Sequence, residues 1–110
     1  MSDDFQIHPA AKDELHEAIR HYAAVDESGG LAVAFEATFW RHTENILATP
    51  LHYNLRRPPT RRVNLTPRFG ETYIAYMLWA EKVVILAIAH AKRRPYYWSK
   101  RIGEAREIFQ

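Results

Sequence analysis

The sequence predicts one α+β domain, in which a strand and a pair of antiparallel helices precede three antiparallel strands. Three observations support this prediction. Apolar residues recur at helical spacing over the first 50 residues, two adjacent glycines interrupt that pattern, and beyond residue 60 the apolar period changes to two. The order of elements is therefore β-α-α-β-β-β. A length of 110 residues fits a single domain, residues 1–110, with its core over about residues 5–101 and a C-terminal tail over 102–110.

The first half of the chain begins with a short strand. Phe5 and Ile7 alternate with polar neighbours ahead of Pro9. Proline suits the first position of a helix because its missing N–H is not needed there. The first helix then runs to the pair Gly29-Gly30, and its apolar face consists of Ala11, Leu15, Ala18, Ile19 and Tyr22. The positive end of the helix dipole accounts for the acidic residues of its early turns, Asp13, Glu14 and Glu17.

A second helix follows the glycine break. Helical spacing resumes at Leu31 and ends at Pro50, which predicts an antiparallel hairpin of two helices. His42 lies on the apolar stripe of this helix and is expected to be a hydrogen-bonded, partly buried side chain. Residues 51–60 have no clear period and contain two adjacent prolines, so they are expected to form a loop.

Three strands are predicted after the loop. Residues 61–65 alternate with a period of two, whereas residues 72–79 and 83–90 are apolar on both faces, as interior strands should be. These strands form an antiparallel meander on which the helical hairpin packs. A short helix is expected after Gly103.

Several classes of protein are excluded by the composition. The chain has no cysteine, so disulfides and thiolate zinc sites are absent. His16 and His21 lie five positions apart, whereas a zinc motif on a helix needs a spacing of four. We therefore expect neither a metal nor a cofactor. The longest apolar run, VVILAIA, is shorter than the ~20 residues of a membrane span, and the start MSDDFQ lacks a secretory layout, which predicts a cytoplasmic protein without a membrane partner.

Charge is divided unequally along the chain. Residues 1–50 carry three Lys or Arg and nine Asp or Glu, whereas residues 51–110 carry twelve and four, which gives formal charges of −6 and +8. A chain polarised in this way has a basic side that suits a nucleic acid or an acidic peptide. A solvated basic surface without a partner is the alternative.

The segment AHAKRRPYYWSKR, residues 89–101, concentrates cations and aromatic residues. Guanidinium groups bind phosphates or carboxylates through paired hydrogen bonds, aromatic rings stack on bases, and histidine transfers protons near neutral pH. Nucleic-acid binding, an acidic partner, acid–base chemistry and plain core packing are all open on this basis. The wider set consists of Arg56, Arg57, Arg61, Arg62, Arg68, His90, Lys92, Arg93, Arg94, Tyr96, Tyr97 and Trp98.

Three longer stretches also stand out: HPAAKDELHEAIRHY, RVNLTPRFGETYIAYML and VVILAIAHAKRRPYYW. They resemble the RelE/ParE superfamily, the toxins of bacterial type II toxin–antitoxin (plasmid stabilization) modules. The resemblance covers about residues 5–101 and implies the same order of elements. It also implies a cognate antitoxin as partner, in a toxin–antitoxin hetero-oligomer. RelE-like members are ribosome-dependent endoribonucleases that cut mRNA, whereas ParE-like members inhibit DNA gyrase.

The RNA-cleaving branch implies two cations on the second strand, an arginine on the third strand, an arginine after the last strand, and a tyrosine or histidine near the C-terminus. The matching positions here hold Arg62, Asn64, Tyr73, Arg93 and Ser99. About half of the cleaving set is therefore missing, and we favour no catalytic residue. A ribonuclease with a rearranged site would use Arg62, His90 and Arg93.

The tail pattern H-x-x-R-x-P-x-x-W is closer to the ParE-like branch. That branch implies that His90 holds the strand end, Pro95 turns the chain and Trp98 packs back, while Arg101 and its neighbouring cations stay exposed. The sequence thus predicts a ParE-like toxin that binds DNA gyrase and is not an enzyme. The ribosome with mRNA is the alternative target, and a non-toxic interaction module is the second alternative. Residues expected to bind the target or the antitoxin are Arg61, Arg62, Lys92, Arg93, Arg94, Tyr96, Lys100 and Arg101.

Overall fold

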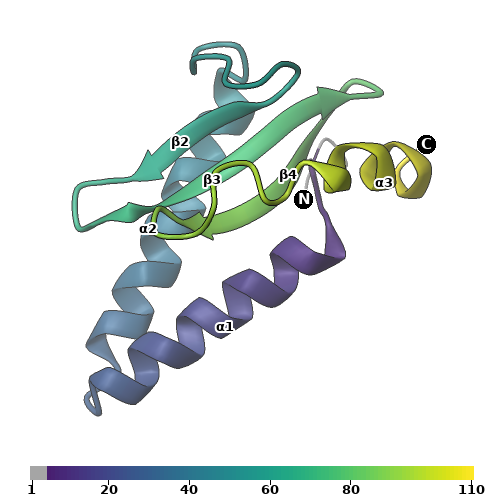
Figure 1. Ribbon diagram of the computed structural model, residues 1–110. Coiled ribbons are helices and arrows are strands. Elements are labelled where there is room, and N and C mark those ends of the chain that lie inside the picture. Colours follow the sequence, from purple (N-terminus) through teal and green to yellow (C-terminus); the bar gives the residue numbers. More distant parts are fainter. Residues whose placement is uncertain (1–4) are drawn as a thin grey trace.

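The computed structural model describes residues 5–110, which form four strands and three helices (Figure 1). In chain order the elements are β1 (Phe5–Ile7), α1 (Pro9–Val25), α2 (Gly30–Ala48), β2 (Arg61–Leu65), β3 (Phe69–Trp79), β4 (Lys82–His90) and α3 (Lys100–Ile108). This order confirms the predicted β-α-α-β-β-β plan and adds a C-terminal helix. No helix among residues 5–110 combines the length and the apolar composition needed to cross a membrane.

The strands form one mixed sheet in the order β1-β4-β3-β2. β1 runs parallel to β4, whereas β3 is antiparallel to both β4 and β2. The predicted antiparallel meander is therefore present, with β1 added at its edge. β3 begins at Phe69, earlier than the expected start at residue 72, because Phe69 pairs with Leu65 at the end of β2.

Two apolar clusters lie on opposite faces of the sheet, because neighbouring side chains of a strand point to opposite sides. The larger cluster joins the hairpin of α1 and α2 to the strands and includes Leu15, Phe35, Phe39, Ile46, Val63, Ile74 and Ile85. The smaller cluster lies under α3 and the segment that precedes it, and includes Tyr73, Ala75, Met77, Trp98 and Ala105. In Figure 1 that segment crosses the sheet on the face opposite to α2.

The C-terminal helix differs from the expectation. α3 begins at Lys100 and contains Gly103 in its interior, whereas a start after Gly103 was expected. Ala105 is buried, and Ile102 and Phe109 pack beside it against the second face of the sheet. Glycine inside a helix costs up to about 1 kcal/mol, and this apolar contact offsets that cost. The core therefore extends to Ala105, beyond the expected limit at about residue 101.

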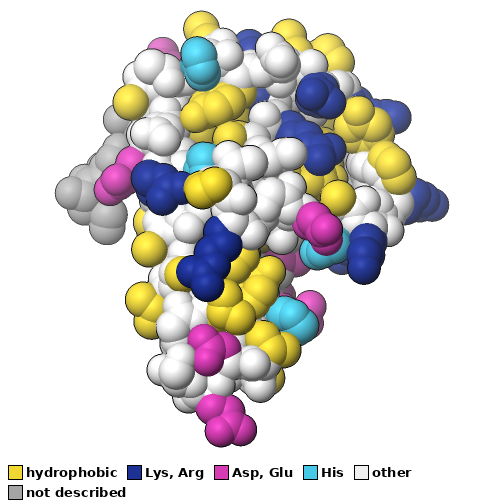
Figure 2. Space-filling view, turned by 90° about the vertical axis from the view of Figure 1, so that its left-hand side faces the viewer, with side chains coloured by type: hydrophobic (Ala, Val, Ile, Leu, Met, Phe, Trp, Pro, Cys, Tyr) yellow, Lys and Arg dark blue, Asp and Glu magenta, His cyan; other side chains and the backbone are white. Residues whose placement is uncertain are grey.

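The division of charge along the sequence is also a division in space. In Figure 2, Lys and Arg side chains gather at the upper right, whereas Asp and Glu mark the lower tip of the molecule. The lower tip is the end of the helical hairpin, where the turn between α1 and α2 contains Asp26 and Glu27. The sheet thus carries the basic side of the protein.

Candidate functional site

The segment after β4 folds back over the second face of the sheet. Trp98 is only 2% exposed, and its Nε1–H donates to the hydroxyl of Tyr73 on β3 over 3.1 Å. Tyr73 is itself 5% exposed. Trp98 therefore packs on the sheet as predicted. The position that matches the third-strand arginine of the RNA-cleaving branch is filled by a buried phenol.

Two arginines lie over aromatic rings beside this pair. The Cζ atom of Arg62 is 3.8 Å from the centre of the Tyr73 ring, and that of Arg57 is 4.1 Å from the centre of the Tyr96 ring. Tyr96 meets Trp98 edge to face, with 5.7 Å between ring centres. We call these five residues the cation–aromatic platform. Stacking occupies one face of a guanidinium and leaves its in-plane N–H groups available to anionic oxygens.

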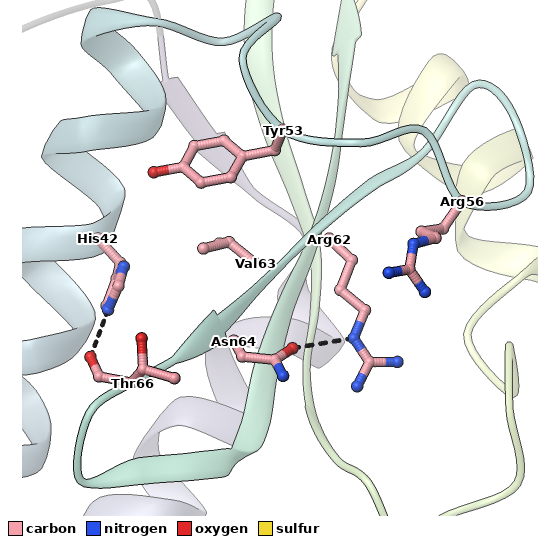
Figure 3. Close-up of a pocket in the computed structure, with 7 residues that line it drawn as sticks. All are labelled: His42, Tyr53, Arg56, Arg62, Val63, Asn64 and Thr66. Atoms are coloured by element: carbon pink, nitrogen blue, oxygen red, sulfur yellow. Dashed lines mark hydrogen bonds between the residues drawn. The ribbon is translucent and has the colours of Figure 1, made fainter.

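A pocket of about 420 Å³ borders β2, the edge strand next to the platform (Figure 3). Nε2 of His42 lies 2.7 Å from the carbonyl oxygen of Thr66, which can only accept, so Nε2 carries the proton. Nδ1 of the neutral ring is then a buried acceptor, and it has no partner among the described residues. On the opposite wall, Arg62 donates from Nε to Asn64 Oδ1 over 3.0 Å, and Arg56 lies beside it. Because Nδ1 of His42 is buried, the pocket presents chiefly the guanidinium groups of Arg56 and Arg62, which suit a negative charge.

A second cleft, of about 640 Å³, lies between α1 and the end of β4. His90 and Arg93 line it together with Glu17 of α1. Nδ1 of His90 accepts the backbone N–H of Lys92 over 3.1 Å, and its Nε2 is 3.4 Å from the carboxylate of Glu71. The ring of His90 thus closes the turn that follows β4.

The three residues of the alternative ribonuclease site are not brought together. Arg62 pairs with Ala75, which belongs to the cluster under α3. His90 pairs with Thr72, and both line the cleft beside α1. Because the side chains of adjacent strand residues alternate between faces, the sheet separates Arg62 from His90. Arg93 lies on the side of His90.

Glu14 of α1 connects the C-terminal segment to the rest of the fold. Its carboxylate is 14% exposed and accepts two hydrogen bonds from the guanidinium of Arg101, at 2.8 and 3.1 Å. It also accepts the hydroxyl of Tyr97 and the backbone N–H of Ile88. Burial, followed by the hydrogen bond to Glu14, raises the pKa of Tyr97. The helix dipole therefore does not account for Glu14, whose partners lie 74 to 87 positions away, where no local pattern marks them.

Most of the predicted binding cations face solvent, but Arg101 does not. Its side chain is 16% exposed, and Nη1 donates to the carbonyl of Leu86 over 3.0 Å as well as to Glu14. The expectation that Arg101 stays exposed for a partner is wrong, because the nearly buried carboxylate holds it against the sheet. Arg61 is half-buried and donates to the carbonyl of Tyr53 over 2.6 Å. The exposed members are Lys92, Arg93, Arg94 and Lys100, and the half-buried members are Arg61, Arg62, Tyr96 and Arg101.

Arg57 belongs to the platform but lies outside the predicted binding set. Its backbone φ is +52°, and that of its partner Tyr96 is +60°, so both residues adopt the left-handed conformation that side chains disfavour. The adjacent arginines before two prolines are the sequence feature that could have identified Arg57 as a candidate binding residue. Their contact with the segment after β4 joins two loops, and no periodicity predicts such a contact.

These features define a class of small α+β proteins, with a helical hairpin on one face of a mixed sheet and stacked cations on the other. This architecture is that of the RelE/ParE superfamily of toxins. The chain belongs to the ParE toxin family, because the family model described as "ParE toxin of type II toxin-antitoxin system, parDE" matches residues 5–95. The match confirms the resemblance seen in the sequence, and it implies a cognate antitoxin as partner. A search of curated proteins finds no match.

Proposed function

We propose that this toxin arrests growth by binding DNA gyrase and that its cognate antitoxin neutralises it in a toxin–antitoxin hetero-oligomer. The observation that carries the proposal is the phenol of Tyr73, which holds Trp98 and supports Arg62. A buried phenol cannot stabilise the charge on a reacting phosphate as a guanidinium does. Binding and inhibition are therefore favoured over cleavage of RNA.

The proposed antitoxin-binding surface is the set of exposed cations on the segment after β4 and at the start of α3, namely Lys92, Arg93, Arg94 and Lys100. An acidic antitoxin segment suits this surface, because opposite charges steer association and fix its orientation. The alternative target, the ribosome with mRNA, needs a cleaving set, and the sheet separates two members of the candidate set, Arg62 and His90. Gyrase works on DNA in the bacterial cytoplasm, and the proposal places this protein there.

Expression of the full chain tests the proposal. We expect growth arrest, restored by coexpression of the small acidic protein encoded beside it. Purified toxin is expected to inhibit supercoiling by purified gyrase while cellular mRNA stays intact. Absence of arrest favours a non-toxic interaction module, and mRNA cut at codons with gyrase unaffected favours the ribonuclease.

Replacement of His90 tests whether this histidine has more than a structural role. The variant His90→Ala is expected to stay folded and to keep its toxicity, because the half-buried ring of His90 bonds the backbone N–H of Lys92 and lies near the exposed Glu71 at the end of β4. His16→Ala, at an exposed position of α1, is the matched control. Loss of toxicity in folded His90→Ala, but not in the control, would mean that the histidine has more than a structural role.

A further inference from the structure

The cations of the platform are held in place yet have no counter-charge among residues 5–110. Among the described residues, no carboxylate oxygen lies within the 4.0 Å limit of an ion pair from Arg57, Arg62 or their exposed neighbour Arg56. Glu71 pairs with His90, and Glu104 pairs with His8. No acidic side chain of residues 51–110 forms an ion pair with these three arginines. The guanidinium N–H groups therefore have bonding capacity left for an anion from outside the chain.

The platform is also fixed before any ligand arrives. Left-handed backbone at a residue other than glycine costs roughly 1–2 kcal/mol, and both Arg57 and Tyr96 adopt that conformation. The stack between their side chains joins the loop before β2 to the segment after β4. Tyr96 is held further by its carbonyl, which accepts both the backbone N–H and the hydroxyl of Ser99. A preformed set of donors loses little side-chain entropy on binding.

The rings of the platform are not free to stack on bases. Tyr73 and Trp98 are buried, one face of Tyr73 carries Arg62, and one face of Tyr96 carries Arg57. Proteins that bind single strands stack successive bases on open aromatic faces. Base stacking on these rings is therefore disfavoured, and the N–H groups of the stacked guanidinium groups are left to bind anionic oxygens. Duplex DNA, whose bases are already stacked and whose phosphates face outward, fits this chemistry better than single-stranded RNA.

A protein partner is less suited to the platform than DNA. Protein interfaces depend on apolar anchors that fill pockets at their centre, and phosphate binding needs none. The exposed large apolar side chains of the described residues lie outside the platform, at Val25, Val33, Trp40, Leu51, Leu55, Leu78 and Ile108. Charge and composition together thus point to phosphate.

We infer that the cation–aromatic platform binds the phosphates of duplex DNA, so that the toxin contacts the DNA held by gyrase as well as the enzyme. This inference rests on the proposed function. The contact is independent of base sequence, because phosphates position a protein without specifying bases.

Binding of the full chain to a short fluorescent duplex, followed by anisotropy over a series of salt concentrations, tests the inference. The double variant Arg57→Gln/Arg62→Gln is expected to bind at least about tenfold more weakly and to lose about 2 from the slope of log K against log salt, since each phosphate contributes about 0.9. The control, Lys12→Gln/Arg20→Gln, removes two exposed cations of α1 and is expected to change affinity by less than about twofold. Equal losses in both double variants, or wild-type binding without salt dependence, would overturn the inference.

Two further measurements, one with a lysine double variant and one with a competing peptide, complete the test. Arg57→Lys/Arg62→Lys keeps both charges and is expected to keep the salt slope, which gives a result even if the glutamine variant does not fold. An acidic peptide of matched charge is expected to compete weakly. If that peptide binds as tightly as the duplex and loses affinity in the same variant, the surface takes a protein partner and the inference fails.

Supercoiling assays with the same proteins separate this inference from the proposed function. Parallel loss of DNA binding and of gyrase inhibition in the glutamine variant is the expected result. Lost DNA binding with full gyrase inhibition overturns the inference and leaves the proposed function standing. Wild-type protein that binds the duplex but never inhibits gyrase overturns the proposed function and the link to gyrase, while the phosphate site itself stands.

Discussion

At the scale of single residues, Glu14 and Arg101 complete the edge of the sheet. β1 pairs with β4 only as far as Ile85, so beyond that residue β4 pairs with β3 on one side and has no strand among the described residues on the other. Glu14 accepts the N–H of Ile88, and Arg101 donates to the carbonyl of Leu86. Buried edge groups without partners are costly, and this ion pair supplies the partners that a longer β1 would have supplied.

The variant Glu14→Gln is expected to destabilise the protein by about 2–4 kcal/mol, because it leaves the nearly buried guanidinium of Arg101 without a counter-charge. Urea denaturation, with an unchanged slope, is the measurement. Glu17→Gln, at an exposed position one turn later in α1, is the control and is expected to change the free energy of unfolding by less than about 0.5 kcal/mol. Equal effects of the two substitutions would contradict the role given to Glu14.

At the scale of elements, two glycines show how position decides what a residue contributes. Gly29 lies at the N-cap of α2 with φ of +83°, where the chain reverses between the two helices. Gly103 lies inside α3, where nothing would contact an added Cβ within 4 Å. The sequence identified both as helix boundaries, but only Gly29 is one. Its left-handed backbone is the feature that needs glycine.

The two alanine variants are therefore expected to have opposite effects. Gly29→Ala is expected to destabilise the protein by about 1 kcal/mol, because alanine is strained at positive φ. Gly103→Ala is expected to stabilise it by about 0.5–1 kcal/mol, because alanine is the better helix former. Thermal unfolding of the two variants side by side is the measurement. Effects of the same sign would mean that α3 is not a stable helix or that the hairpin turn tolerates a side chain.

At the scale of the whole molecule, the buried Tyr76 and the half-buried Tyr97 make global stability depend on pH. Tyr76 is fully buried in the larger cluster and donates its hydroxyl to the carbonyl of Pro50. Burial raises the pKa of Tyr76 from 10.0 to about 12. Burial and the hydrogen bond to Glu14 raise the pKa of Tyr97 as well. Each cluster thus depends on a phenol that must stay protonated.

Stability is expected to be constant up to about pH 10 and to fall from there toward pH 12. Above pH 10 the unfolded chain loses the tyrosine proton while the folded chain keeps it, so the folded state binds more protons and its stability falls as pH rises. For Tyr76 the loss amounts to about 2–3 kcal/mol. Tyr76→Phe is expected to cost about 1 kcal/mol at neutral pH, through the lost hydrogen bond, and then to decline less steeply. Urea midpoints measured from pH 8 to 12 test this, and parallel curves for the two proteins would contradict it.

Most of the fold could be predicted from the sequence because it depends on periodicity. Helical spacing, the glycine break at Gly29, the switch to a period of two and the doubly apolar run of β4 are local properties, and each gave the right element. The packing of Trp98 was also expected, because the resemblance of the tail pattern H-x-x-R-x-P-x-x-W to the ParE-like branch implies it. The start of α3 could not, because packing of Ala105 on the sheet overrides the helix-breaking tendency of Gly103.

The candidate site depended on tertiary structure to a much greater degree. The sequence by itself determined that the strand half is cationic and aromatic and that its chain resembles a toxin family. Only the folded chain decided which cations are available, because Glu14 takes Arg101 out of solvent and the sheet places Arg62 and His90 on opposite faces. It also brought Arg57 onto Tyr96. Such pairs lie far apart in the sequence, and long-range contacts leave no periodic signal along the chain.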